Sequence, residues 1–201
     1  QQRGQEAAGI ASLDDGKIRV EREMGYVADV FDEARLSRVP GRTAIGHVRY
    51  STAGASMLAN AQPIVFATKH GPLGLAHNGN LVNAREIRAV LESQGALFTT
   101  TSDSEVILHL VARSQASTLA GAIAEALLEV RGAYSLVILS REGIFAARDP
   151  NGIRPLSLGI REGSPVGASA TCAFDLIGAR FERDGDPGEI GKPWWGGFAC
   201  H

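Results

Sequence analysis

Alternating apolar and polar residues along the first half of the chain predict paired β-strands. Residues 12–23, SLDDGKIRVERE, form two alternating runs about an Asp-Gly pair, which favours a tight hairpin turn. The run TAIGHVRYS at 43–51 predicts a buried strand, and QPIVFATKHGPLGLAH at 62–77 predicts two strands about a Gly-Pro turn. Further along, AYSLVILS at 133–140 and IFAARD at 144–149 flank the turn REG and predict a second hairpin.

Apolar residues at helical spacing predict helices at 27–41, 84–94, 103–114, 118–132 and 171–179, the last followed by a strand at 180–184. Asn83 with Glu86, and Ser102 with Glu105, have the spacing of a capping box, in which side chains satisfy the first backbone N–H groups of a helix. Gly95 is expected to end the helix that begins near residue 84.

The order of these elements predicts an α+β fold. Strands come in hairpins and helices in separate groups, which is typical of antiparallel sheets covered by helices rather than of an alternating parallel fold. No repeat or linker interrupts residues 1–190, so we interpret them as one domain. Residues 191–201, GKPWWGGFACH, differ in composition, and we expect this tail to lie outside the core.

Composition excludes several classes of protein. The net charge of the 201 residues is −2, so no broad attraction to nucleic acid or to an anionic membrane is expected. No apolar run approaches the roughly 20 residues that span a bilayer, and the first residues do not form a signal peptide. The two cysteines, Cys172 and Cys200, lack paired spacing, which fits a reducing cytosol and gives no basis for a metal site.

Polar groups concentrate in four segments, at 3–9, 47–54, 77–80 and 99–105, which we expect to be loops at strand or helix ends. The third segment, HNGN, contains an Asn-Gly pair that no second strand follows, so it does not read as a hairpin. Such a pair can present an amide NH₂ and an unhindered backbone N–H side by side, as in an oxyanion hole. An ordinary turn beside a helix start is the alternative.

Two charged residues each have a structural and a functional interpretation. Asp103 is expected in the first turn of a helix, where its charge complements the helix dipole unless it has a functional role. Arg49 ends an otherwise apolar strand, where it either clamps a carboxylate or pairs with a structural acid. The histidines show no metal-ligand spacing, and Cys172 is expected to be a packed thiol.

Taken in order, these segments resemble class II glutamine amidotransferases, the N-terminal-nucleophile family. The matching stretches are QQRGQEAAGI, GRTAIGHVRYSTAG, NAQPI, AHNGNLVNAREIR, TTTSDSEVILHL, GAYSLVIL, AARDPNGIRPLSLG and TCAFDLIGA, followed by PGEI at 187–190. Two of them, RGQEAAGI and DPNGIRPL, favour the N-terminal glutaminase domain of amidophosphoribosyltransferases over that of glucosamine-6-phosphate synthase.

This resemblance implies a four-layer α/β/β/α sandwich of antiparallel sheets, the N-terminal nucleophile hydrolase fold. It also implies a nucleophilic N-terminal cysteine whose own α-amino group acts as the base. The side chain of Asn78 and the N–H of Gly79 would form the oxyanion hole. Arg3 and Gly4 would position the loop that carries the nucleophile.

The resemblance further implies that the chain binds glutamine. Arg49, with Thr52 adjacent, would hold the α-carboxylate, and Asp103 would hold the α-ammonium group. The thiol would then attack the side-chain amide, releasing ammonia and, after hydrolysis of the thioester, glutamate. In the whole enzyme this ammonia would convert phosphoribosylpyrophosphate to 5-phosphoribosylamine in purine synthesis.

The sequence departs from the family pattern at several points. The nucleophilic cysteine, which would precede Gln1, and the phosphoribosyltransferase domain are absent, so we expect this polypeptide alone to be inactive as a glutaminase. Ala170 stands where relatives usually carry an acid, and residues 191–201 match nothing expected. Two alternatives therefore stay open: the glutaminase domain of another class II amidotransferase, and a non-catalytic glutamine-binding module.

For the full-length protein, the resemblance implies a cytoplasmic homo-oligomer with the phosphoribosyltransferase domain on the same chain. Mg²⁺ would be bound at that absent domain, and no cofactor or metal is expected within residues 1–201. Whether the full-length protein carries an iron–sulfur cluster stays open. No nucleic acid or membrane partner is expected.

Overall fold

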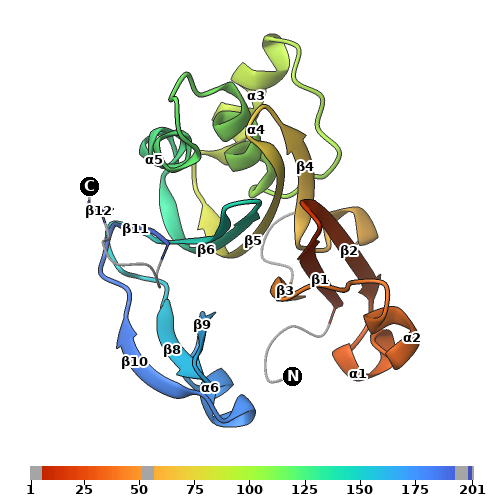
Figure 1. Cartoon of the computed structure of the whole chain (residues 1–201). Helices are drawn as coiled ribbons and strands as arrows, with labels where there is room; N and C mark the ends of the chain where they lie inside the picture. The colour runs from red at the N-terminus through yellow and green to blue at the C-terminus, as the bar shows by residue number, and fades with distance from the viewer. Residues whose placement is uncertain (1–5, 51–56, 193–198, 201) are drawn as a thin grey trace.

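All strand pairings in the described part of the chain are antiparallel, and they form three sheets (Figure 1). The computed structural model describes residues 6–50, 57–192 and 199–200. The N-terminal sheet has the order β2 (Lys17–Met24), β1 (Ala7–Asp14), β3 (Thr43–Arg49). The central sheet has the order β12 (Ala199–Cys200), β11 (Glu189–Gly191), β7 (Gly143–Arg148), β6 (Gly132–Ser140), β5 (Gly71–Leu81), β4 (Ile64–Thr68). The C-terminal sheet has the order β10 (Arg180–Asp184), β8 (Ser157–Arg161), β9 (Ser164–Ala168).

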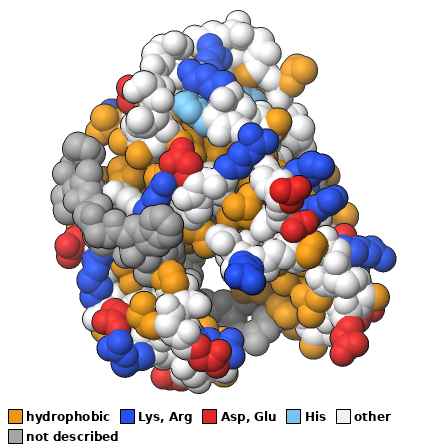
Figure 2. Space-filling view, in the orientation of Figure 1, with side chains coloured by type: hydrophobic (Ala, Val, Ile, Leu, Met, Phe, Trp, Pro, Cys, Tyr) orange, Lys and Arg blue, Asp and Glu red, His pale blue; other side chains and the backbone are white. Residues whose placement is uncertain are grey.

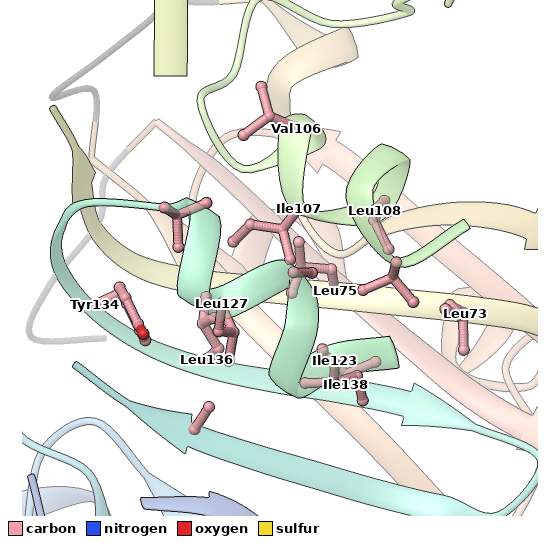
Figure 3. Close-up of a cluster of buried hydrophobic side chains, with 14 of the residues drawn as sticks. Leu73, Leu75, Val106, Ile107, Leu108, Ile123, Leu127, Tyr134, Leu136 and Ile138 are labelled. Carbon is pink, nitrogen blue, oxygen red and sulfur yellow. The ribbon is translucent and has the colours of Figure 1, made fainter. Parts of the chain in front are cut away.

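Three helices cover one face of the central sheet: α3 (Ala84–Ser93), α4 (Glu105–Arg113) and α5 (Leu119–Glu129). Their apolar side chains meet those of β4 to β7 in the main core, part of which is drawn in Figure 3. Leu75 and Leu136 of the strands and Ile107 and Ile123 of the helices are fully buried there. The apolar stripes of these helices therefore hold them on this face of the sheet.

The opposite face of the central sheet packs against the N-terminal sheet. Ala11 and Ile45 of the N-terminal sheet contact Ala76 and Leu139 of the central sheet in a second, smaller core. In Figure 1 the C-terminal sheet lies on this same side, opposite α3, α4 and α5. The short helices α1 (Val27–Val30), α2 (Glu33–Leu36) and α6 (Cys172–Ile177) lie beyond these two sheets (Figure 1). This arrangement confirms the α+β, four-layer sandwich of antiparallel sheets.

Elements whose signals are local occur where the sequence predicts them. Asp15 and Gly16, with φ values of 46° and 71°, form the turn between β1 and β2, as the Asp-Gly pair predicts. The second predicted hairpin is β6 and β7. Helix α5 begins at the N-cap Thr118, whose side chain accepts a hydrogen bond from the N–H of Gly121, and Gly95 follows α3 with a φ of 87°.

Several expectations about helices are wrong. The single helix expected at 27–41 is two short helices, α1 and α2, because Asp32 between them caps the second through the N–H of Arg35. Neither expected capping box forms. The side chain of Asn83 instead donates to the carbonyl oxygen of Glu129 at 2.9 Å and accepts from the N–H of Arg131 at 2.8 Å, tying the start of α3 to the end of α5.

The second expected box fails because α4 begins at Glu105, so Asp103 precedes the helix rather than lying in its first turn. Glu105 is buried and accepts hydrogen bonds from the N–H and hydroxyl groups of both Thr99 and Thr100, at 2.6–3.1 Å. Burial by itself raises the pKa of Glu105, but these hydrogen bonds outweigh it and the pKa is lowered. The carboxylate therefore organises the loop that leads to Asp103.

Two strand regions also differ from expectation. The segment at 77–80 is not a loop, because β5 continues through Asn78 and Gly79 to Leu81. The hairpin of β8 and β9 is not among the predicted elements, although its turn at 161–163 has the same sequence, Arg-Glu-Gly, as the turn between β6 and β7. Strand β11 extends one residue past the expected end of the domain at residue 190, and Ala199–Cys200 pairs with this strand. The remaining residues of 193–201 lie outside the described residues.

The loop after β7 joins the central sheet to the C-terminal sheet. The guanidinium group of Arg148 donates to the carbonyl oxygens of Gly152, Arg154 and Gly185 at 2.6–2.8 Å. Asp149 is fully buried and accepts from backbone N–H groups of the same loop. Among the described residues, no helix combines the length and hydrophobicity required to cross a membrane.

Candidate functional site

The last residues of β5 have one edge that no strand covers in the described part of the chain. On that side β4 pairs only with Gly71 to Leu75, so residues 76–81 extend beyond it. On the other side, Gly79 lies opposite Tyr134 of β6, but the N–H and C=O of Tyr134 both bond to Asp149. Gly79 and Tyr134 are therefore a non-hydrogen-bonded pair, and the N–H of Gly79 points to the uncovered edge.

Side chains cap the N–H groups on either side of Gly79. The N–H of His77 donates to Oε1 of Gln62 at 2.7 Å, and the N–H of Leu81 donates to Oδ2 of Asp103 at 2.8 Å. Between them, the N–H of Gly79 has no acceptor among the described residues. One backbone donor is thus left available at this edge.

Only glycine fits at position 79. A Cβ there would lie 2.0 Å from the carbonyl oxygen of Ala133 and 2.8 Å from Cα of Tyr134, both on the neighbouring strand β6. It would also lie 2.7 Å from Nε2 of His77. The absent side chain lets β6 and the His77 ring approach the strand closely and leaves the N–H unobstructed.

The side chain of Asn78 is on the face of β5 that points toward the N-terminal sheet. Side chains alternate along a strand, and Ala76, two residues earlier, packs against Ala11 and Ile45 of that sheet. Asn78 and Gly79 are both half-buried, and in the described part of the chain no hydrogen bond engages the Asn78 carboxamide. An amide NH₂ and an adjacent backbone N–H are both accessible here.

Arg49 ends β3 on the facing sheet. It shares a face with Ile45 and His47, which is the face toward the central sheet, and it is 5% exposed. Nη1 of Arg49 lies 3.5 Å from Oε2 of Glu6, so the arginine does pair with an acid. Nε2 of His47 donates to the carbonyl oxygen of His77 at 3.0 Å, which ties the end of β3 to β5 beside Asn78.

Asp103 reaches the same edge from the helical layer. Besides accepting from the N–H of Leu81, its Oδ1 lies 3.3 Å from the hydroxyl of Ser104 and 3.5 Å from that of Ser102. Its side chain is 12% exposed. Asp103, Asn78 and Gly79 are thus brought together at the end of β5, with Arg49 on the sheet that faces them.

Burial keeps two histidines beside this site uncharged at neutral pH. It lowers the pKa of His77 below its ordinary value, although Asp103, 3.8 Å from Nδ1, acts in the opposite direction. The same Nδ1 lies 2.8 Å from the hydroxyl of Ser104. Burial also lowers the pKa of His47 to about 4, against the effect of its hydrogen bond to the His77 carbonyl.

We predict that acidification destabilises the protein through His47. Its pKa is about 4 when folded, whereas 6.5 is the ordinary value, so the unfolded chain binds more protons between these limits. The free energy of unfolding therefore decreases as the pH is lowered through this window, by roughly 2 kcal/mol between pH 7 and pH 5. Urea unfolding at pH 7 and pH 5 tests this. The decrease in unfolding free energy between the two pH values should be smaller in His47→Gln than in the wild type, although His77, whose pKa is also lowered, still contributes part of it. Equal losses in both proteins would contradict the prediction.

The other expected site residues, Arg3, Gly4 and Thr52, lie outside the described residues. Gln62, His77 and Ser104 lie in the stretches NAQPI, AHNGNLVNAREIR and TTTSDSEVILHL, but neither their residue type nor their spacing gave any of them an expected role at the site. No group of His, Cys, Asp or Glu side chains among the described residues has the geometry of a metal site. Cys172, the one free cysteine described, is half-buried in α6 on the C-terminal sheet.

The fold and this site define a class of protein. The chain belongs to the glutamine amidotransferase domain family, whose model matches residues 47–175 and so includes Arg49, Asn78, Gly79 and Asp103.

Amidophosphoribosyltransferases are among the proteins to which the chain is similar. Amidophosphoribosyltransferase 1, chloroplastic, of Arabidopsis thaliana is 50% identical over 192 residues, which are 94% of this chain and 34% of that protein. The Bacillus subtilis enzyme is 47% identical over 191 residues, 94% of this chain and 40% of that protein. The structure of glutamine phosphoribosylpyrophosphate amidotransferase from B. subtilis complexed with ADP and GMP gives a TM-score of 0.88 at 46% identity, covering 94% of this chain and 41% of that one. The chain thus spans about a third to two fifths of the length of these relatives.

Proposed function

We propose that this chain is the glutamine-hydrolysing domain of an amidophosphoribosyltransferase. The observation that carries the proposal is the N–H of Gly79, left without an acceptor between two capped N–H groups and next to the Asn78 carboxamide. Two donors placed in this way can stabilise the negative oxygen that forms when a nucleophile attacks an amide. The alternative interpretation, an ordinary turn at residues 77–80, does not account for this arrangement, because β5 continues through these residues.

Two opposite charges flank these donors in a way that suits an α-amino acid. Asp103 offers a carboxylate to the α-ammonium group, and Arg49, from the facing sheet, offers a guanidinium group to the α-carboxylate, with Thr52 three residues further along the chain. With both ends of glutamine held, its side-chain amide is the part left to reach Asn78 and Gly79.

The reaction itself requires a thiol. A cysteine thiolate attacks the amide carbon and forms a C–S bond, and Asn78 and Gly79 hold the tetrahedral oxygen. The C–N bond then breaks, and the nitrogen leaves as ammonia with the proton that the cysteine's α-amino group had taken from the thiol. Water then hydrolyses the thioester to glutamate. We propose that an N-terminal cysteine of the longer polypeptide supplies this thiol, with Arg3 and Gly4 positioning its loop, because Cys172 lies on the C-terminal sheet.

The remaining length of the relatives suggests a second domain on the same chain. We propose that this domain is the phosphoribosyltransferase, which uses the ammonia and phosphoribosylpyrophosphate to form 5-phosphoribosylamine with Mg²⁺ as its metal. Its assembly as a cytoplasmic homo-oligomer belongs to the same proposal.

Calorimetric titration with L-glutamine and an assay of ammonia release test the function. We expect residues 1–201 to bind L-glutamine but release no ammonia, and the longest native polypeptide containing them to release ammonia at a rate abolished by alkylation of its cysteines. Binding without release by both polypeptides would favour the non-catalytic glutamine-binding module. No binding to residues 1–201 and no release by the longer polypeptide would overturn the proposal.

A further inference from the structure

Gln62 contacts the three parts of the protein that carry the candidate glutamine-binding groups. It lies between η1 (Leu58–Asn60) and β4, where the chain passes from the N-terminal sheet to the central sheet (Figure 1), and it is 6% exposed. A buried carboxamide must satisfy both its donor and its acceptor. Gln62 does so with partners that are far apart in the sequence.

Two of these contacts use the side chain. Oε1 accepts from the N–H of His77 at 2.7 Å, directly before Asn78 and Gly79 in β5. Nε2 donates to the hydroxyl of Ser104 at 3.2 Å, directly after Asp103. One carboxamide thereby joins the strand with the open donor to the loop with the carboxylate.

The third contact uses the backbone and reaches the N-terminal sheet. The carbonyl oxygen of Gln62 lies 2.2 Å from the position that a Cβ on Gly9 would occupy, so only glycine permits this approach. The preceding carbonyl, of Ala61, accepts from Nη1 of Arg22 at 2.6 Å. Gly9 pairs with His47 in β3, two residues before Arg49.

We propose that Gln62 is a positioning residue for the glutamine site, which rests on the proposed function. By hydrogen bonding to β5 and to the loop before α4, and by packing its backbone carbonyl against Gly9 of β1, it sets the separation of Gly79, Asp103 and Arg49 without touching the substrate. By occupying the N–H of His77, it also leaves the N–H of Gly79 as the available donor at this edge. The side chain must both accept and donate, which a methionine of similar length cannot do.

Gln62→Met in residues 1–201 tests the proposal. We expect the variant to keep its far-ultraviolet circular dichroism and to bind L-glutamine about tenfold more weakly, as the loss of a net hydrogen bond in the site predicts. In ¹⁵N–¹H spectra, the amide signals of Gly79 and His77 should move in the free protein, and the shift of Gly79 on adding L-glutamine should shrink. If Gln62→Met does not fold, Gln62→Asn serves instead, because it keeps both polar groups but shortens their reach, with a smaller effect in the same direction.

Ser12→Ala is the matched control. Ser12 is buried in β1 and donates to the carbonyl oxygen of Pro40 at 2.6 Å, so its loss also removes a buried hydrogen bond from the N-terminal sheet. We expect it to lower the unfolding temperature while leaving glutamine affinity and the Gly79 signal unchanged. Wild-type affinity and an unmoved Gly79 signal in the Gln62 variant would overturn the proposal. Failure of the wild-type chain to bind glutamine would instead count against the proposed function, while the free-state Gly79 signal would still report on Gln62.

Discussion

Gly79→Ala is expected to lower both the stability of the protein and its response to glutamine. The added Cβ would lie 2.0 Å from the carbonyl oxygen of Ala133, so β5 and β6 must separate to admit it. Overpacking of this kind costs about 1–3 kcal/mol, or roughly 3–10 °C in the unfolding temperature of a domain of this size. Because the shift also moves the N–H of Gly79, L-glutamine binding should become too weak to measure by calorimetry.

Gly95→Ala is the control for this substitution. Gly95 also has a positive φ, of 87°, but a Cβ there would have no atom within 4 Å. It should therefore show only the cost of the left-handed conformation, about 1–2 kcal/mol, with glutamine affinity intact. A Gly79→Ala protein that unfolds at the wild-type temperature and binds glutamine normally would contradict our description of the β5 edge.

Asp103→Asn should weaken L-glutamine binding by roughly ten- to a hundredfold. The asparagine keeps an oxygen that can accept from the N–H of Leu81, so the strand edge remains capped. What it loses is the negative charge opposite the α-ammonium group, and a hydrogen bond to a charged group contributes about 1.5–3 kcal/mol. Calorimetric titration of the two proteins at pH 7.5 measures the difference.

Glutaramate, which lacks the α-amino group, separates the charge effect from a general disturbance. It should bind weakly to the wild type, and Asp103→Asn should not weaken it further. Asp184→Asn is a matched variant in the C-terminal sheet, where the carboxylate accepts from the hydroxyl of Ser157 at 2.6 Å, and it should bind L-glutamine as the wild type does. If Asp103→Asn lowered the affinities for glutamine and glutaramate equally, the result would contradict the proposed role of Asp103 in binding the α-ammonium group.

The accuracy of the sequence-based expectations follows the range of the interactions concerned. The Asp15-Gly16 turn and the spacing of apolar residues along α5 are local features, so the β1–β2 hairpin and α5 could be predicted. The extension of β5 through Gly79 could not, because it depends on pairing with Tyr134, more than fifty residues along the chain. The failure of the Asn83 cap has the same origin, since its side chain bonds to the end of α5.

Some residues of the candidate site could be identified from the sequence, and others only from the folded structure. Asn78, Gly79, Arg49 and Asp103 lie in sequence stretches that resemble the family, and the structure brings Asn78, Gly79 and Asp103 to the end of β5 with Arg49 on the facing sheet, although their roles stay predictions. Gln62 also lies in such a stretch, NAQPI, but no role could be assigned to it from the sequence, because its significance lies in three contacts that only the folded chain creates. Charge gives little guidance either, since Lys and Arg are interspersed with Asp and Glu on the surface seen in Figure 2.

The short uncovered edge of β5 has a consequence for solubility. Exposed peptide groups in a row are a template on which a foreign strand can add, which is how sheets grow into aggregates. Here a carboxamide and a carboxylate take the place that a neighbouring strand would fill. By capping the N–H groups on either side of Gly79, Gln62 and Asp103 prevent another polypeptide from forming a continuous row of β-sheet hydrogen bonds along this edge.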